Sequence, residues 1–544
     1  MRPSCLFWGL TGSLRAVEAL SPTVTLKDAV YIGTTTQVAS ATTIVDKFLG
    51  IRYADTPKRF RAARPRPPGS LLVNATKQPP ACIQQSSSGD SAESEDCLFL
   101  NVFAPHIGCG KPKAKRAVML WFYGGALSFG SIREVDGSSF AAKQDIILVA
   151  CNYRLGVFGF PGNVSGFRPD ELNPGFRDQK MALRWIQENI ARFGGDPTKV
   201  TIFGESAGAV SVDSHLISEL GDHPPFRAAI LQSGGLHTFN RIALGVGVSV
   251  TGLGTGNKPG EAPFLTLAKH MNCSEEDPVS CLQSKPLAAV KSAVLNLNLL
   301  FAPVDDGAKT SVADTDSARR AGRTAKVPVL IGSTFMEGNI FPAAALQQKT
   351  VGGWADVIYP DNPAAASAIA DAYAVGSSWQ TGTPDEAVRL LHSDFQFACT
   401  TTYDSNMMAS IGIPTRRYLF NASLPSGLAS HGSEISFVFG SDQSTPANQA
   451  LGAKIQKAWA DFAKNPSSGP GWVKYVPDTP SLADLGGEGD RASITVIDPV
   501  VVDSRCSVFW DAYDPSRPSA PKENISRNET LLEATAMTAG RHVR

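Results

Sequence analysis

The feature that most constrains the fold of this 544-residue chain is a series of short apolar runs without polar alternation. A strand with one face in water alternates apolar and polar residues, whereas a continuous apolar strand needs cover on both faces. Such cover is typical of parallel sheets in α/β proteins. We therefore predict a central, mostly parallel sheet flanked by helices. The runs are residues 117–123, 146–153, 200–203, 228–231, 327–331 and 417–420.

A helical pattern lies between the second and third runs. Residues 178–193 place five large apolar side chains on one helical stripe, as expected of a helix that packs on a sheet. Strand, helix and strand in this order predict a right-handed crossover unit. The chain shows no fixed-period repeat and no low-complexity linker, so we expect residues 20–544 to form one large domain with insertions. The stripe consists of Met181, Trp185, Ile186, Ile190 and Phe193.

The segment 204–208 reads Gly-Glu-Ser-Ala-Gly and directly follows the apolar run 200–203. A Gly-x-Ser-x-Gly between a strand and a helix is the nucleophile elbow, in which glycines let the two elements approach and the serine sits in a strained turn. A bare match arises by chance in a chain with 49 glycines. Its place after a strand and before AVSVDSHLI favours Ser206 as a nucleophile.

The surrounding motifs resemble a known family. FGGDP at 193–197 and VTIFGESAG at 200–208 are similar to the nucleophile signature of the type-B carboxylesterase/lipase (cholinesterase-like) family of α/β-hydrolases, and EDCLFLNV at 95–102 is similar to its N-terminal cysteine motif. The likeness spans nearly the whole chain. It implies the α/β-hydrolase fold and hydrolysis of carboxylic esters through an acyl-enzyme. Further matching segments are 48–54, 152–160, 173–179, 230–235 and 437–440.

A serine hydroxyl needs a base, and the base needs a carboxylate to hold its tautomer. In α/β-hydrolases the chain order is serine, acid, histidine. His237 comes too soon after Ser206, whereas His270, His392, His431 and His542 leave room for an acid. The segment LASHGSEISFVFG resembles the family's histidine loop, so we predict His431 as the base. His392 lies in the helical-looking EAVRLLHSDF, and we interpret it as a helix-surface or packing residue.

The segment VPVLIGSTFMEGNIF places Glu337 shortly after a buried strand, at a position that matches the family's acid. Asp305 and Asp306 compete, but their loop precedes a predicted strand, so we interpret them as turn formers. Glu205, beside the nucleophile, is expected either to tune the site electrostatically or to pair with a buried neighbour.

The tetrahedral intermediate of ester hydrolysis needs backbone N–H donors already aimed at its oxyanion. Gly124-Gly125-Ala126 follows a strand, as the family's oxyanion loop does, so we predict donors at Gly125, Ala126 and Ala207. The family more often has three glycines followed by Phe. Ala126 and Leu127 fill the last two of these places here, which leaves the backbone donor but changes the shape of the pocket.

The resemblance also implies structural pairs. Cys82 and Cys97, and Cys273 and Cys281, fall where the family carries disulfides, and Arg59 with Glu95 resembles a family salt bridge. Cys151 lies within an apolar run and is expected to be a buried thiol. A bond between Cys399 and Cys506 is an open alternative, and no pairing follows for Cys5 or Cys109.

Several features favour an oxidising compartment. Residues 1–19 combine Arg2, an apolar stretch and small residues suited to cleavage after Ala19, although Arg15 and Glu18 are atypical of a signal peptide. The alternative is a frayed or misassigned N-terminus. No later apolar run is long enough to cross a bilayer, so we expect a secreted protein. Six sequons support this compartment, at Asn74, Asn163, Asn272, Asn421, Asn524 and Asn528.

The substrate is expected to be a small ester. The 50 basic and 50 acidic residues cancel, which argues against a nucleic-acid partner. We expect no cofactor and no metal. The loop between Cys82 and Cys97 is short, polar and free of aromatic residues, which disfavours both a choline site and a lipase flap and favours a carboxylesterase. The alternatives are a lipase or sterol esterase and, least favoured, a non-catalytic cholinesterase-like adhesion protein.

Overall fold

A computed structural model describes the chain over most of its length. The signal-peptide prediction and the residues Cys5, Cys109, Asn524 and Asn528 lie outside the described residues. The described ranges are 21–85, 92–107, 115–218, 224–238, 262–307, 309–310, 314–340, 349–377, 382–425, 427–442, 444–487 and 489–513.

The described strands form an 11-stranded main sheet and a 3-stranded sheet. The main sheet contains β3 Thr34–Gln37, β4 Ile44–Arg52, β6 Phe99–Pro105, β7 Arg116–Phe122, β8 Ile147–Cys151, β9 Gly195–Glu205, β10 Ala228–Gln232, β11 Val329–Thr334, β12 Thr415–Phe420, β13 Leu482–Leu485 and β14 Ile494–Ile497. The small sheet contains β1 Thr23–Thr25, β2 Ala29–Ile32 and β5 Leu71–Asn74.

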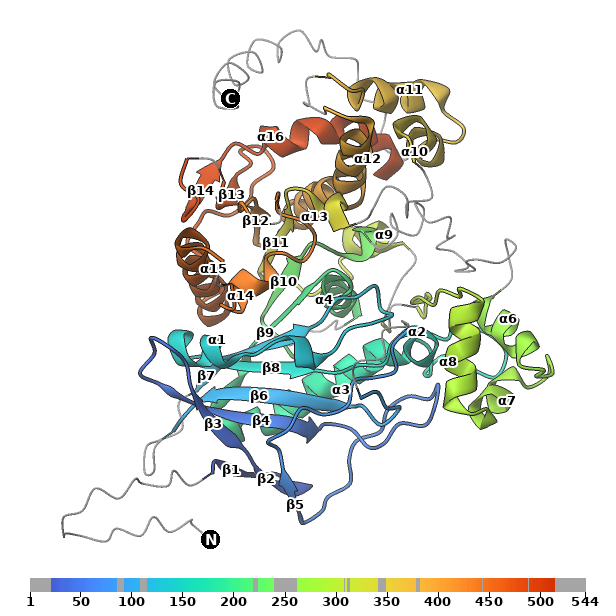
Figure 1. Ribbon diagram of the computed structural model, residues 1–544, viewed down its shortest axis with the longest axis vertical. Helices are drawn as coiled ribbons and strands as arrows, with labels where there is room; N and C mark the ends of the chain where they lie inside the picture. Colours follow the sequence, from blue (N-terminus) through green and yellow to red (C-terminus); the bar gives the residue numbers. More distant parts are fainter. Residues whose placement is uncertain are drawn as a thin grey trace.

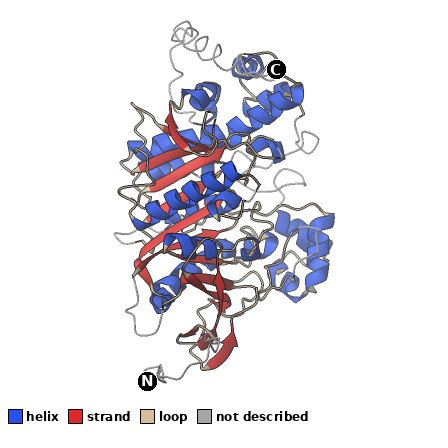
Figure 2. Cartoon of the chain, turned by 60° about the vertical axis from the view of Figure 1, so that its left-hand side comes forward, coloured by secondary structure: helices blue, strands red, loops and turns tan. Residues whose placement is uncertain are grey.

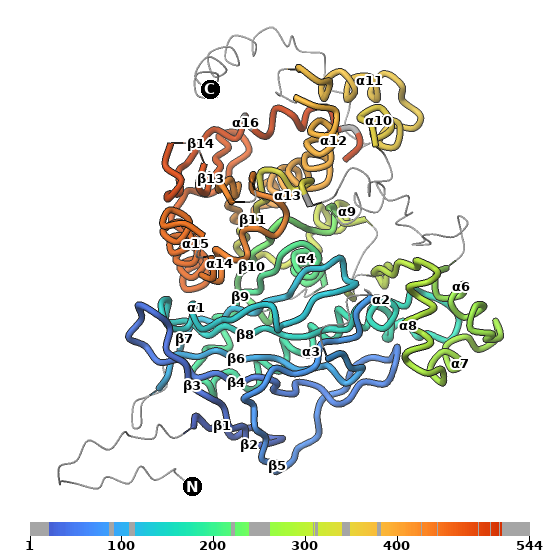
Figure 3. The backbone as a smooth tube through the Cα atoms, in the orientation of Figure 1, coloured from blue at the N-terminus to red at the C-terminus, as the bar shows by residue number. Residues whose placement is uncertain are grey.

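The main sheet has the order β14-β13-β12-β11-β10-β9-β7-β8-β6-β4-β3. The strands from β13 to β8 are parallel, whereas β14 at one edge and β6, β4 and β3 at the other pair antiparallel. The sheet runs from the N-terminal strands at one end of the molecule to the C-terminal strands at the other (Figure 3). The prediction of a mostly parallel sheet is confirmed, and all six apolar runs overlap strands of its parallel part.

Helices cover both faces of this sheet. Their bounds are α1 Ser138–Gln144, α2 Gly156–Gly159, α3 Pro174–Asn189, α4 Ala207–Ser218, α6 Pro263–His270, α7 Pro278–Ser284, α8 Leu287–Asn296, α9 Thr315–Arg320, α10 Val351–Ile358, α11 Pro363–Ala372, α12 Pro384–Ser393, α13 Cys399–Ser410, α14 Ile435–Val438, α15 Pro446–Lys464, α16 Val500–Asp503 and α17 Trp510–Tyr513. The predicted helix over 178–193 is α3 with the 3-10 turn Ile190–Phe193 that follows it.

The lack of polar alternation in the strands has a direct cause. In β7, Met119 and Trp121 enter a core shared with α1 and α15, whereas Leu120 and Phe122 enter a second core shared with α3 and α4. Both faces are therefore apolar. Figure 2 shows the helices that lie on the two sides of the sheet. Two helical excursions extend this sandwich, α6–α8 after β10 and α10–α12 after β11 (Figure 1).

Among the described residues, three disulfides hold loops and excursions, Cys82–Cys97, Cys273–Cys281 and Cys399–Cys506. The first two are the predicted pairs, and the third settles the alternative left open. Cys151 is a buried thiol in β8, and burial raises its pKa well above the usual range. Within the described part of the chain, no helix has both the length and the apolar character that crossing a membrane requires.

Candidate active site

The candidate catalytic residues lie at one edge of the sheet. Ser206 follows β9, Glu337 follows β11 and His431 lies in the loop after β12, while the loop 124–130 follows β7. These strands are parallel and lie next to one another around β10, so their carboxyl ends open onto the same place. In open α/β sheets that edge is where ligands bind.

Ser206 occupies a sharp turn between β9 and α4. Its φ of 54° lies in the left-handed region that most residues avoid, and its N–H donates to the Gln232 carbonyl oxygen over 2.8 Å. A β-carbon on Gly204 would lie 2.5 Å from the backbone of Gly208, and one on Gly208 would lie 2.0 Å from the Phe122 carbonyl oxygen. Only glycine fits at either position, as the elbow motif requires.

His431 and Glu337 form a close pair, with Nδ1 of the imidazole 2.5 Å from Oε2 of the carboxylate. Glu337 is fully buried, and its second oxygen accepts the N–H of Thr334 at 2.6 Å. The Met336 N–H donates to the Ala429 carbonyl oxygen over 2.8 Å and so joins the two loops. The acid therefore holds Nδ1 of the imidazole, and Nε2 is the ring nitrogen that Glu337 does not contact.

Nε2 of His431 faces the segment that carries the serine. It lies 3.2 Å from Oε1 of Glu205, the residue before Ser206. Burial by itself would lower the pKa of His431, but the charges of Glu205 and Glu337 and the hydrogen bond from Glu337 outweigh burial and raise that pKa to about 9. Burial raises the pKa of Glu205 to about 7, against the opposing effect of His431.

A third carboxyl group, Glu434, was not found from the sequence. It lies three residues after His431, is buried, and accepts a hydrogen bond from Nε2 of Gln232 at 3.2 Å. Burial raises its pKa to about 8, and the charges of Glu205 and Glu337 add to the rise. The site thus gathers more carboxyl groups around one imidazole than a minimal triad uses, which favours the protonated imidazole.

The ring of Phe397 also contacts the imidazole of His431, with centroids 4.8 Å apart. It belongs to a π-helical turn, Asp394–Ala398, between α12 and α13. Turns of this kind often occur at functional sites. The sequence gives no periodic signal for a single π turn, so this contact was missed.

The loop 124–130 has an unusual backbone. Gly125 has a φ of 95°, and Ala126 and Leu127 have φ of 53° and 56°. Two consecutive left-handed residues that are not glycine are rare and strained. The loop closes on itself because the N–H groups of Ser128 and Phe129 both donate to the Gly125 carbonyl oxygen.

The competing histidine and aspartates make other contacts. His392 is buried in α12, where its ring packs edge-on against Trp354 at 5.5 Å, and burial lowers its pKa to about 3. Asp305 accepts the N–H of Gly307, and Asp306 accepts the N–H of Thr310, both over 2.8 Å, as turn formers do.

The predicted structural ion pair is present. Arg59 contacts Glu95 over 2.7 Å and also donates to carbonyl oxygens at the end of α7.

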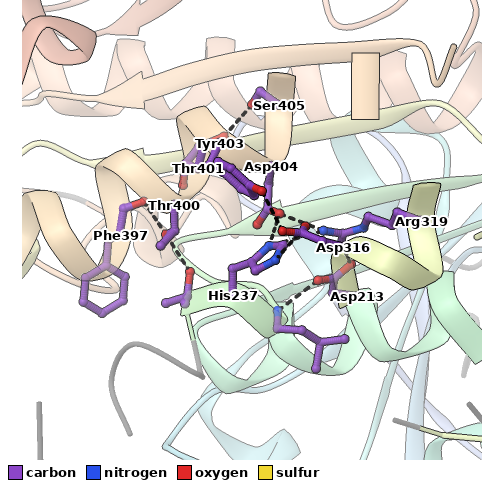
Figure 4. A network of polar contacts seen from close by, with 12 residues as sticks. Asp213, His237, Asp316, Arg319, Phe397, Thr400, Thr401, Tyr403, Asp404 and Ser405 are labelled. Atoms are coloured by element: carbon purple, nitrogen blue, oxygen red, sulfur yellow. Dashed lines mark hydrogen bonds and ion pairs between the residues drawn. The ribbon is translucent and has the colours of Figure 1, made fainter. Parts of the chain in front are cut away.

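A second buried charge network brings together residues of α4, α9 and α13 (Figure 4). His237, in a helical turn after β10, contacts Asp404 at 2.5 Å and Asp316 at 3.0 Å, and Arg319 contacts Asp404 at 2.7 Å. Burial would lower the pKa of His237, but these two carboxylates raise it to about 9. The network also includes Asp213 of α4, which pairs with Arg319 and accepts the Leu236 N–H. It therefore joins α4, the helix that follows Ser206, to α9 and α13.

Comparison with known proteins agrees with this geometry. The sequence profile of the carboxylesterase family matches residues 20–493. The chain is 32% identical to acetylcholinesterase of Bungarus fasciatus over 81% of this chain and 79% of that protein. It is 30% identical to carboxylesterase 1D of Rattus norvegicus over 87% and 90%, and 33% identical to lipase 2 of Geotrichum candidum over 62% and 69%. The chain therefore belongs to the carboxylesterase family and is a carboxylic ester hydrolase.

Proposed function

We propose that this protein hydrolyses carboxylic esters through an acyl-enzyme, with Ser206 as nucleophile, His431 as base and Glu337 as the acid that orients the base. The observation that carries the proposal is the 2.5 Å contact between His431 and Glu337, made at the sheet edge where Ser206 stands in its strained turn. A base held in one tautomer beside a serine at an elbow is the arrangement that serine activation requires.

The reaction proceeds in two halves. Oγ of Ser206 attacks the ester carbonyl carbon while Nε2 of His431 takes the hydroxyl proton, and the charge of Glu337 stabilises the imidazolium that results. The proton then passes to the alkoxide oxygen as the alcohol leaves and the acyl group remains on Ser206. Water repeats the attack with the same base, which releases the carboxylic acid and restores the serine.

The oxyanion of each tetrahedral intermediate would be held by the backbone N–H groups of Gly125, Ala126 and Ala207. One such donor lowers the barrier by about 3 kcal/mol. The left-handed conformation of Gly125 and Ala126 supports this assignment, since strain at a ligand-facing turn persists where function uses it.

We assign Glu205 and Glu434 an electrostatic role. Negative charge near the imidazole stabilises its protonated form, and that form arises during the attack. The short distance from Glu205 to His431 supports this role for Glu205. This role also predicts that activity rises with increasing pH, as the coupled groups Glu205, Glu434 and His431 lose their protons.

Carboxylesterase is the preferred class of enzyme. The polar loop between Cys82 and Cys97 offers no aromatic side chain for a choline group and no amphipathic flap. A lipase activity is the alternative, favoured by Phe129, an exposed aromatic side chain on the candidate oxyanion loop, and by the similarity to a lipase. The two are separated by the rate at substrate concentrations above the solubility limit, where a lipase accelerates and an esterase does not.

The test of the function is hydrolysis of p-nitrophenyl acetate, butyrate and palmitate by the wild type and by Ser206→Ala. The expected result is turnover by the wild type and loss of turnover in the variant, with both proteins equally folded. A folded wild type that leaves all three esters intact would contradict the proposal and favour a binding role.

We further infer that the protein is an exported glycoprotein. Three disulfides support an oxidising compartment, and the side chains of Asn74, Asn163 and Asn272 are exposed. Peptide N-glycosidase treatment of protein recovered from the medium of eukaryotic cells tests this, with an increase in gel mobility expected. Protein retained in the cytosol without a mobility change would contradict it.

A further inference from the structure

The loop closed by the Cys82–Cys97 disulfide touches the candidate oxyanion loop through one amide side chain. Oε1 of Gln84 accepts the N–H of Gly130 at 2.6 Å, and Nε2 donates to the carbonyl oxygen of the same residue over 3.1 Å. Nε2 also donates to the Cys82 carbonyl oxygen over 2.7 Å. Gln84 is buried. Its amide binds both the N–H and the carbonyl oxygen of Gly130 and links them to the backbone of Cys82, one half of the disulfide.

Other contacts hold the same loop at neighbouring points. The Gln85 N–H donates to the Ser128 carbonyl oxygen and the Gly156 N–H donates to the Leu127 carbonyl oxygen, each over 2.7 Å. These two contacts use backbone atoms, so side-chain substitution does not remove them. The Gln84 amide is the side-chain contact that fixes the end of the loop.

The loop needs such external contacts. Ala126 and Leu127 both hold left-handed backbone conformations, which relax toward ordinary ones unless the surroundings oppose it. Gly130 packs tightly, since a β-carbon there would lie 2.6 Å from the Tyr123 ring and 2.8 Å from the Gly124 carbonyl oxygen. A change in the backbone conformation of Gly130 therefore also displaces Ala126 and Leu127.

We propose that Gln84 is a positioning residue for the oxyanion hole, and this inference rests on the proposed function above. By fixing Gly130, its amide keeps the N–H groups of Gly125 and Ala126 aimed at the developing oxyanion. The disulfide holds Gln84 in turn, because Cys82 is two residues away and its carbonyl oxygen accepts a hydrogen bond from the Gln84 amide. Gln84 touches no reacting atom and acts only through the loop.

The neighbouring Gln85 provides a matched control. It has the same side chain and lies in the same loop, but its amide donates to the Leu299 carbonyl oxygen instead of the oxyanion loop. We would compare Gln84→Met with Gln85→Met in the full-length protein, because methionine keeps the length of the side chain and removes the amide. Thermal unfolding and active-site titration report folding and the concentration of competent sites.

The expected result is specific to transition-state stabilisation. Gln84→Met lowers kcat by about tenfold to hundredfold, since small displacements of oxyanion donors carry losses of this order, while KM stays near the wild-type value. Gln85→Met keeps kcat near that of the wild type. The inhibition constant of a trifluoromethyl ketone, whose adduct with serine carries an oxyanion, rises by the same factor as kcat/KM falls.

Three outcomes would overturn the inference: an unchanged kcat in Gln84→Met, an equal loss in both variants, or a loss confined to KM. If Gln84→Met does not fold, Gln84→Leu replaces it, because this variant also removes the amide but adds no charge beside the carbonyl oxygens of Gly130 and Cys82. Gln84→Glu, which keeps an acceptor for the Gly130 N–H and replaces the donor with a carboxylate oxygen, is compared with it. The expected loss of kcat is present in both variants. A wild type that does not hydrolyse esters would instead contradict the proposed function itself.

Discussion

Replacing Glu205 by glutamine tests the electrostatics of the site. Nε2 of His431 lies 3.2 Å from Oε1 of Glu205, and among the nearby charges that of Glu205 raises the pKa of His431 most. At an effective dielectric constant of about 20, unit charges at this separation attract by about 5 kcal/mol. That figure is an upper bound, because Glu205 has a pKa of about 7 and carries its charge only part of the time near neutral pH.

The direction of the expected pH shift follows from the protonation state of His431 that the charge of Glu205 favours. His431 acts as a base only when neutral, and the negative charge of Glu205 favours the protonated form. Glu205→Gln removes that charge, so His431 loses its proton at lower pH. We expect the acid limb of kcat/KM against pH to move down by about one to three pH units, the usual effect of one nearby charge.

The assay is kcat/KM for p-nitrophenyl butyrate between pH 5 and pH 11, a range that spans the pKa of about 9 of His431, with spontaneous hydrolysis subtracted and circular dichroism as the check on folding. Glu434→Gln is the matched control, because Glu434 raises the pKa of His431 less than Glu205 or Glu337 does. Its acid limb should move by a smaller amount. An acid limb that stays in place in Glu205→Gln, or that moves to higher pH, would refute the reasoning.

Three further predictions use the same geometry. Glu337→Gln should lower kcat by about 10⁴-fold in ester assays with little change in thermal stability, because the amide can hold the wrong tautomer of the base; an active variant would remove Glu337 from the triad. Gly208→Ala should destabilise the fold by about 1–3 kcal/mol in a denaturant titration, or prevent folding, because its β-carbon would lie 2.0 Å from the Phe122 carbonyl oxygen. A stable, active variant would contradict the close packing of the elbow. His237 has a pKa raised to about 9, so its ion pairs should add on the order of 3 kcal/mol below its unfolded pKa of about 6.5 and lose this as the pH rises through about 9. Unfolding titrations of the wild type and His237→Gln should converge above pH 9, and parallel curves would refute this.

The parallel centre of the sheet could be predicted because each of its strands is apolar on both faces. Strand β4, which lies between the edge strand β3 and β6, could not be predicted in this way, since Asp46, Lys47 and Arg52 interrupt its apolar residues. The helical-looking EAVRLLHSDF indicated α12, but helices α10 and α11 were missed for another reason. They pack in a small core of their own, and none of the predicted strands indicates where that excursion leaves the sheet.

The predictions for Ser206, Glu337 and His431 rested on chain order and resemblance, and the fold brings all three to one sheet edge. Glu434 and the network around Arg319 could not be found in the same way. Asp213 and Arg319 are 106 residues apart, and a charged residue in a sequence is ordinarily read as exposed. Burial of a charge becomes visible only when its partner is placed, which requires the tertiary structure.

The most direct test of the central claim is to label the wild type with a fluorophosphonate and identify the modified peptide by mass spectrometry. The account predicts one label, on Ser206, whose formation is lost in Ser206→Ala and slowed in a folded His431→Gln variant. A label on another residue, or a folded and ester-hydrolysing wild type that takes no label, would contradict the claim that Ser206 is the nucleophile.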